Sequence, residues 1–483
     1  MAFEMTQTNL NIGKKLVGEV NVSNKLTPSE DTKPIKILKT AGAASVTSVE
    51  MLADGFMVSG KVNVSAAFID ETGDISNAIG EFDFTQKIDT TLTGVEFLAR
   101  VIDTQARIAD DAIFVSNVIE IEAFGYQEST LSTLAENEDI VARTTETEVK
   151  SVAAVAASTF TIAEDIALNS GDEEIELVSA DVLVSEATSA PDGVTVSGAC
   201  IVKLWVKTEN GFDEIAKTFD FKQELDVLGA TDGQTASVNL SVTNVTAAIE
   251  DNGDEQKQAN ITVDVKAVAF TLEDKAITLT PDAFSCSGEL KLATEYIEAT
   301  QVGEAQMLTD NIVYGIGLED YPEFDAIKLV AVTGVPFSQA DGEISGNINL
   351  DVIFETLDGG IDKKAAQIPF TLNSNDVATD VAAVVNSFKI RGTSELEVIL
   401  NVSAQTYKEA KANFSFVSSA ELEESSPDEA GVKMIVAKEN EDLFDICRAL
   451  KVRPEMLKAQ NEGLEEVHAG DKIFVYLPEI VNF

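Results

Sequence analysis

The chain has 483 residues, 45% of them hydrophobic and 24% charged, so it is long enough for three or four domains and apolar enough to fold. Its 83 acidic and 34 basic residues give a net charge of -49, which excludes nucleic acid and anionic membranes as expected partners. One histidine, His468, and three widely spaced cysteines provide neither zinc-ligand spacing nor a catalytic constellation, so we expect no enzyme, no metal and no cofactor.

The predicted cellular setting is a reducing one. An odd number of cysteines fits a cytoplasmic protein, and residues 1–20 lack the charged and apolar regions of a signal peptide. No run of about twenty apolar residues occurs, so we expect no membrane insertion.

Three similar segments follow one another along the chain. Each carries an Asp-Gly pair and then a Ser-Gly pair: Asp54-Gly55 and Ser59-Gly60, Asp192-Gly193 and Ser197-Gly198, Asp341-Gly342 and Ser345-Gly346. After each Ser-Gly pair, apolar residues recur at every second position, which is typical of a half-buried strand. Thirteen residues beyond the pair comes a turn glycine, namely Gly73, Gly211 or Gly359. Each segment therefore predicts a β-hairpin.

The return strand of each hairpin ends in an aromatic residue: Phe84, Phe221 and Phe370. Pro369 lacks a ladder donor, which predicts a sheet edge in the third copy. Trp205 falls on the strand face opposite the core positions, and its neighbours Ala199 and Ile201 favour burial under a second sheet. The acidic run 250–255 is typical of a hairpin turn rather than a calcium loop.

These patterns predict a mainly β protein with three tandem antiparallel β-sandwich or barrel-like repeats. The expected repeats cover 1–126, 150–270 and 285–418, with polar joints at 127–150 and 271–284 and an acidic linker over 419–432. Three such domains in a row predict a rod or an arc.

The last segment, 433–483, predicts a small β-α-α-β module. Asp442 is a good N-cap for an amphipathic helix over Leu443–Leu450, and Pro454 opens a second helix. A closing strand follows over 472–477. Arg448, Lys451, Arg453 and Lys458 form a basic cluster on the two helices, which is either a solvated face or a contact for an acidic partner.

The module resembles a LysM domain, through Asp442-Leu443-Phe444-Asp445-Ile446, Gln460-Asn461, Ala469-Gly470-Asp471-Lys472-Ile473 and Leu477-Pro478. Asn440-Glu441-Asp442 stands where the family usually has Gly-Asp-Thr. The resemblance implies a groove between two loops that holds an N-acetylglucosamine chain in glycan-binding members. Its positions here are Glu439, Asn440, Glu441, Asp442, Asn461, Glu462 and Gly463.

Three such repeats ahead of a terminal LysM domain resemble the SPOCS-domain proteins, morphogenetic proteins of the endospore envelope. This resemblance implies a mother-cell cytoplasmic protein that becomes part of the spore coat. It also implies a LysM module that binds the scaffold protein of the basal coat layer. The sequence thus predicts a non-enzymatic adaptor. A homo-oligomer is one possible assembly of this adaptor. A peptidoglycan-binding protein and a phage-like tail or baseplate component remain as alternatives.

Overall fold

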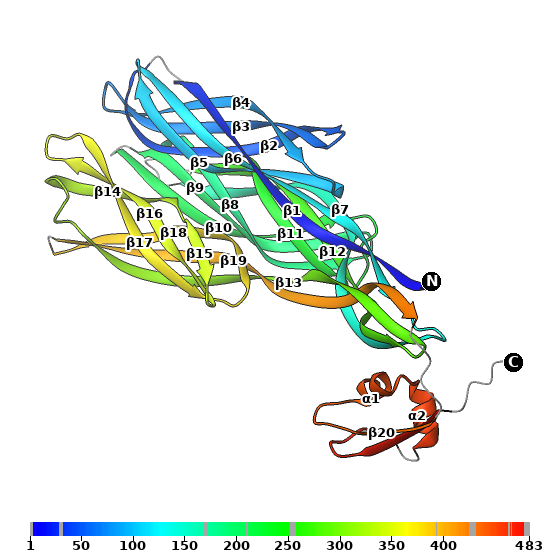
Figure 1. Cartoon of the computed structure of the whole chain (residues 1–483). Coiled ribbons are helices and arrows are strands. Elements are labelled where there is room, and N and C mark those ends of the chain that lie inside the picture. Colours follow the sequence, from blue (N-terminus) through cyan, green and yellow to red (C-terminus); the bar gives the residue numbers. More distant parts are fainter. Residues whose placement is uncertain are drawn as a thin grey trace.

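The chain is mainly β. Strands make up 81% of it, and two short helices accompany several antiparallel sheets in a propeller-like arrangement (Figure 1). The computed structural model describes residues 3–28, 32–168, 172–208, 211–251, 257–392, 394–424, 431–461, 464 and 466–477. In this described part, neither helix has the length and apolar character needed to cross a membrane.

The strands before residue 425 form three units. The first unit comprises β1 (Met5–Pro28), β2 (Pro34–Leu52), β3 (Gly55–Asp70), β4 (Ile75–Asp89), β5 (Thr93–Ala109) and β6 (Ala112–Leu134). The second comprises β7 (Ile140–Ala167), β8 (Asp172–Ala190), β9 (Gly193–Thr208), β10 (Gly211–Asp226), β11 (Thr235–Asp251) and β12 (Lys257–Ser285). The third comprises β13 (Gly288–Gly317), β14 (Phe324–Gly334), β15 (Phe337–Ala340), β16 (Glu343–Thr356), β17 (Ile361–Asn373), β18 (Val377–Arg391) and β19 (Glu395–Glu424).

Strands pair in the same order in each unit. In the first unit, β6 lies between β1 and β5, while β3 lies between β2 and β4. The second and third units repeat this order, with β14 and β15 together in the place of β2. Apolar side chains from both strand groups of a unit meet in one core, because alternate residues of every strand point inward.

The hairpins β3–β4, β9–β10 and β16–β17 confirm the three predicted from the turn glycines. In each, the Ser-Gly glycine lies opposite the final aromatic of the return strand: Gly60 opposite Phe84, Gly198 opposite Phe221, Gly346 opposite Phe370. A Cβ on any of these glycines would overlap the aromatic ring and a main-chain oxygen of a neighbouring segment. The glycine is therefore required by close packing. Pro369 lies in β17, which pairs with β16 alone among the described strands, as predicted for an edge.

The expected polar joints are strands. Residues 127–134 continue β6, 140–150 begin β7, and 271–284 belong to β12. Gln127 pairs with Ile12, and Arg143 pairs with Asp282. Apart from residues 135–139, the segments expected to be joints therefore belong to paired strands, with a register shift between Leu279 and Asp282. The expected linker over 419–432 is strand at both ends, since 419–424 lies in β19 and 431–432 in the next strand, while 425–430 lies outside the described residues. Of the acidic run 250–255, residues 250 and 251 end β11, and 252–255 lie outside the described residues.

The three units pack around a common centre, so the expected rod or arc is wrong. One buried cluster takes residues from all of them: Leu38, Ala67, Ile69 and Ile75 from the first, Leu177, Trp205 and Phe212 from the second, Leu329, Ala331 and Ile353 from the third. Trp205 is 1% exposed there, which confirms its predicted burial. The middle strands have apolar side chains on both faces. Because the second face must also be buried, the neighbouring units pack against it.

The long strands extend past the units as a stalk. Here the ribbons β1–β6, β7–β12 and β13–β19 run together (Figure 1). Two small cores join them, the first with Leu10, Leu131, Ile277 and Phe416, the second with Leu134, Ile140, Ala283 and Val417.

The C-terminal residues 431–477, called the head below, lie at the tip of the stalk (Figure 1). The head contains β20 (Gly431–Val436), α1 (Leu443–Leu450), α2 (Pro454–Gln460) and β21 (Lys472–Leu477). β20 and β21 pair antiparallel, and both helices pack on one face of the pair. The predicted order of elements, β-α-α-β, is present.

Candidate functional site

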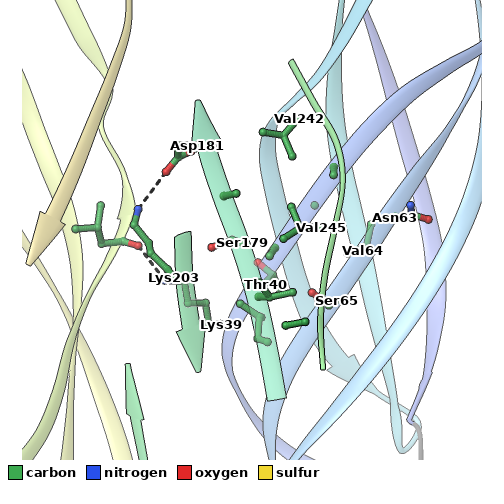
Figure 2. A pocket seen from close by; sticks show the side chains of 18 of the residues that line it. Lys39, Thr40, Asn63, Val64, Ser65, Ser179, Asp181, Lys203, Val242 and Val245 are labelled. Atoms are coloured by element: carbon green, nitrogen blue, oxygen red, sulfur yellow. Dashed lines mark hydrogen bonds and ion pairs between the residues drawn. The ribbon is translucent and has the colours of Figure 1, made fainter. Parts of the chain in front are cut away.

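A cavity of about 590 Å³ opens where the three units meet (Figure 2). Its lining comes from β2, β3, β4, β8, β9, β11 and the third unit, and includes Lys39, Asn63, Ser179, Asp181 and Lys203. Figure 2 shows Lys203 turned toward Asp181, at 3.2 Å. The lining of the cavity therefore mixes charged, polar and apolar side chains.

The lysines of this cavity are engaged by the protein itself. Lys39 Nζ lies 3.2 Å from a carboxylate oxygen of Glu214 and donates to the main-chain oxygen of Val332 at 3.2 Å. Glu214 also accepts from Trp205 Nε1 at 2.6 Å. Burial lowers the pKa of Lys39, and the Glu214 carboxylate opposes that shift. Because Lys39, Glu214 and Val332 belong to three different units, this network serves to join them.

In the head, the loop predicted to line one side of the groove is folded onto itself. Asp442 caps α1, accepting from the main-chain N of Asp445, whose side chain accepts in turn from the main-chain N of Asp442. Glu441 accepts from the main-chain N of Lys438 at 2.8 Å. Glu439 and Asn440 are exposed, and Asn440 has a φ of 65°. Asp442 and Glu441 of this loop thus act as a helix cap and a turn cap.

Asn461, on the other side of the predicted groove, binds the edge of β21. Its amide donates to Phe474 O at 2.6 Å and accepts from Phe474 N at 2.9 Å. Gln460 makes the same pair of bonds with the main chain of Tyr476, at 3.1 and 2.6 Å. The Gln-Asn pair therefore replaces a third strand. Within the described residues no hydrogen bond or ion pair joins Asn461 to the 439–442 loop, and Glu462 and Gly463 lie outside them.

The structure divides the predicted basic cluster. Arg448 pairs with Asp282 of β12 and with Asp445, and Arg453 donates to the main-chain oxygens of Asn137 and Glu138. Lys451 is the exposed left-handed C-cap of α1, with a φ of 54°, and Lys458 is exposed on α2. The two arginines hold the head to the stalk.

Arg143 of β7 is a residue of this contact that sequence reasoning missed. Its Nη2 lies 2.8 Å from Asp442 and 3.1 Å from Asp445, and its guanidinium lies 4.5 Å from the Phe444 ring centroid. Phe284 of β12 packs edge-on against Phe444, with ring centroids 5.2 Å apart. Arg143 and Phe284 were missed because both lie in segments that the sequence analysis expected to be joints between repeats.

The cysteines of this region are packed. Cys447 is buried in α1, and burial raises its pKa to about 12. Cys286 is half-buried against the head, and burial raises its pKa while Arg453 lowers it. In the second unit, burial raises the pKa of Cys200 to about 12. Among the residues described, no three His, Cys, Asp or Glu side chains converge as a metal site requires.

An exposed apolar face of the head was also missed. On the side of the sheet away from the helices lie Val432, Met434, Val436, Phe474 and Tyr476, called the open face below. Val432 is 68%, Met434 56% and Tyr476 59% exposed. Val432 pairs with Tyr476, Met434 with Phe474, and Val436 with Lys472, so the five apolar side chains form one patch with a lysine at its end. The signal was an apolar run on both faces of a strand that helices cover on only one.

Comparison with known proteins gave no match: no family model, no curated protein and no solved structure is similar to this chain.

Proposed function

We propose that this protein is a non-enzymatic adaptor whose head binds a protein partner through the open face. The observation that carries the proposal is an apolar patch with exposed aromatic rings, Phe474 and Tyr476, on a module fixed at the tip of the stalk. Exposed patches of this kind, with a polar rim, are typical of protein-binding surfaces. Arg143, Arg448, Arg453 and the Phe284–Phe444 pair hold the head in this position.

The resemblance to SPOCS-domain and LysM proteins supports a location in the endospore envelope, with a coat scaffold protein as the partner. In this proposal the three acidic units provide the lateral surface of the adaptor and contact neighbouring molecules of the coat. The cytoplasm of the mother cell would be the place of synthesis. The lysines of the central cavity, held between units, support a structural role for that region.

A glycan is the second candidate ligand, because exposed Tyr476 and Phe474 could stack on sugar rings. The loops that carry the groove positions of glycan-binding LysM domains are engaged in capping and in the Gln460–Asn461 clamp. A glycan would thus bind on the open face, and the same substitutions test both candidates.

The test uses the tagged full chain as bait in lysate of sporulating cells, beside the variant Phe474→Ser/Tyr476→Ser. We expect one protein to be retained by the wild type and lost with the variant, whereas Lys438→Ala, a cation of the head outside the open face, retains it. Sedimentation with purified cell wall is run in parallel. Wall binding that the double variant abolishes, without a retained protein, would replace the adaptor by a peptidoglycan-binding protein.

A further inference from the structure

The two edges of the head sheet differ. Gln460 and Asn461 bond to the main chain of Phe474 and Tyr476 and so cover the edge of β21. β20 pairs only with β21 among the described strands. The head sheet therefore has one covered edge and one edge that the described residues leave unpaired.

Main-chain groups on this second edge can be assigned from the pairing. Phe474 and Tyr476 direct N–H and C=O outward to the amides, so their partners Met434 and Val432 are not hydrogen-bonded to β21 at those positions. Antiparallel strands alternate, and the N–H and C=O of Val432, Met434 and Val436 therefore point away from β21. These three residues also carry the side chains of the open face. The unpaired edge and these three side chains of the open face therefore lie on the same strand, β20.

Charge at the end of the open face indicates the kind of partner. Lys472 is exposed and pairs across the sheet with Val436, and it forms no ion pair within the described ranges. By contrast, Lys39, Arg143 and Arg448 all pair with carboxylates. A carboxylate on a strand added beside β20 would lie about 10 Å across the sheet from the Lys472 main chain, within reach of two long side chains.

We propose that an extended segment of the protein partner adds to the edge of β20 as a third strand. This segment has apolar residues at alternate positions, which extend the open face, and an acidic residue beside Lys472. The inference rests on the proposed function and specifies how the partner binds. A second copy of this chain is the weaker occupant. Two copies of this chain, each with a charge of -49, repel each other, whereas a partner of different charge does not.

The probe is a fluorescein-labelled peptide of alternating valine and threonine with a glutamate at each end, and its counterpart has a lysine at each end. Both are titrated into the full chain by fluorescence anisotropy. We expect the glutamate peptide to bind and the lysine peptide to bind about tenfold more weakly, the effect of one charge-assisted contact. Lys472→Glu should reverse this preference. No binding of the glutamate peptide up to 1 mM, or no change of preference in Lys472→Glu, would overturn the proposal.

Proline at Met434 removes only an outward N–H, because that N–H does not bond to β21. We expect Met434→Pro to weaken binding of the glutamate peptide at least tenfold, while Met434→Val, which keeps the N–H and an apolar side chain, binds like the wild type. Protection of buried Cys447 from iodoacetamide shows whether the head is folded. If Met434→Pro unfolds the head, the peptide preference of Lys472→Glu alone tests the proposal.

The same variants separate this inference from the proposed function. If the lysate partner is lost with Phe474→Ser/Tyr476→Ser but retained by both Met434→Pro and Lys472→Glu, the partner uses the open face without adding a strand, and only the inference fails. If the wild type retains no protein, the proposed function itself fails.

Discussion

Substitution of Arg143 by alanine should weaken the attachment of the head to the stalk. Arg143 reaches from β7 to the two carboxylates of the α1 capping box, at 2.8 and 3.1 Å, and lies over the Phe444 ring. The alanine variant loses both contacts while the capping box itself stays intact. The Phe284–Phe444 pair and the bonds of Arg448 and Arg453 remain.

The expected loss is modest because the contact is partly exposed. The side chain of Arg143 is 36% exposed and that of Asp442 58%, so water screens the ion pair. Such a pair contributes about 0.5–1 kcal/mol, and the contact with the ring about the same. Together they amount to about 1–2 kcal/mol, or about 5- to 30-fold in the docking equilibrium.

Cys286 reports the position of the head without any added label. It is half-buried against the head, whereas Cys200 and Cys447 are fully buried. Release of the head exposes the Cys286 thiol and lowers its raised pKa toward that of a free cysteine. Both effects increase the thiolate available to iodoacetamide. We expect Cys286 of Arg143→Ala to react about 5- to 30-fold faster than that of the wild type at pH 8, measured by mass spectrometry.

Lys438→Ala is the matched control, since it removes a cation of the head whose ion pair, at 3.7 Å, is with Glu441 of the head itself. Its Cys286 should react at the wild-type rate. Raising the salt concentration to 1 M should speed the wild-type reaction by screening the ion pairs. An unchanged rate in Arg143→Ala would refute the role of Arg143 and leave the aromatic contact as the attachment.

Three further predictions concern stability and pH. Gly198→Ala should lower the free energy of unfolding by about 2–4 kcal/mol, because its Cβ overlaps the Phe221 ring and a main-chain oxygen, whereas Gly317→Ala has open space and should change little in calorimetry. Tyr407→Phe removes the hydroxyl that donates to Val238 O at 2.5 Å across two units; a loss of about 1–3 kcal/mol in urea unfolding is expected, and a loss below 0.5 kcal/mol would contradict it. Burial raises the pKa of the Asp445 carboxyl. The main-chain N–H of Asp442 and the guanidinium of Arg143 lower it by more, so the net pKa is depressed. A depressed carboxyl pKa stabilises docking above about pH 4 and loses this effect as pH falls, so small-angle scattering should show head release only below about pH 4.

The sequence predicted the hairpins because their determinants are local. Turn glycines, alternation and a closing aromatic fix β3–β4, β9–β10 and β16–β17 without reference to the rest of the chain. Pro369 and Trp205 were also placed correctly, since an absent donor and an apolar residue on a second face each allow few environments.

The arrangement of the units could not be predicted in the same way. Contacts such as Tyr407 with Val238 join residues more than 150 positions apart, and no local pattern specifies them. The expected joints failed for a related reason. Residues such as Arg143 and Asp282 look like those of a solvated loop, and only the neighbouring ribbons of the stalk make them a strand with two distinct faces. Tertiary context decides here over composition.

The candidate site shows the same limit. Asp442 was predicted as an N-cap and is one, whereas Asn461 was predicted as a ligand-binding residue and bonds to β21. A polar residue beside a strand edge can either bind a ligand or bond to the main chain of that edge. Which of the two occurs depends on the geometry of the edge. The open face escaped notice because Val432 and Met434 look like core residues until the helices are seen to cover only one side.

The use of the few cations connects this architecture with the proposed assembly. Lys39, Arg100 and Lys363 each reach from one unit to another, and Arg143 and Arg448 join head and stalk. Because these cations are engaged in internal contacts, the outer surface has a large excess of carboxylates. This negative charge repels other copies over about a Debye length. Lateral contacts between copies should therefore form only when salt or a cationic partner screens this charge. In the proposed adaptor, we therefore expect the less acidic head to bind its partner before lateral contacts form.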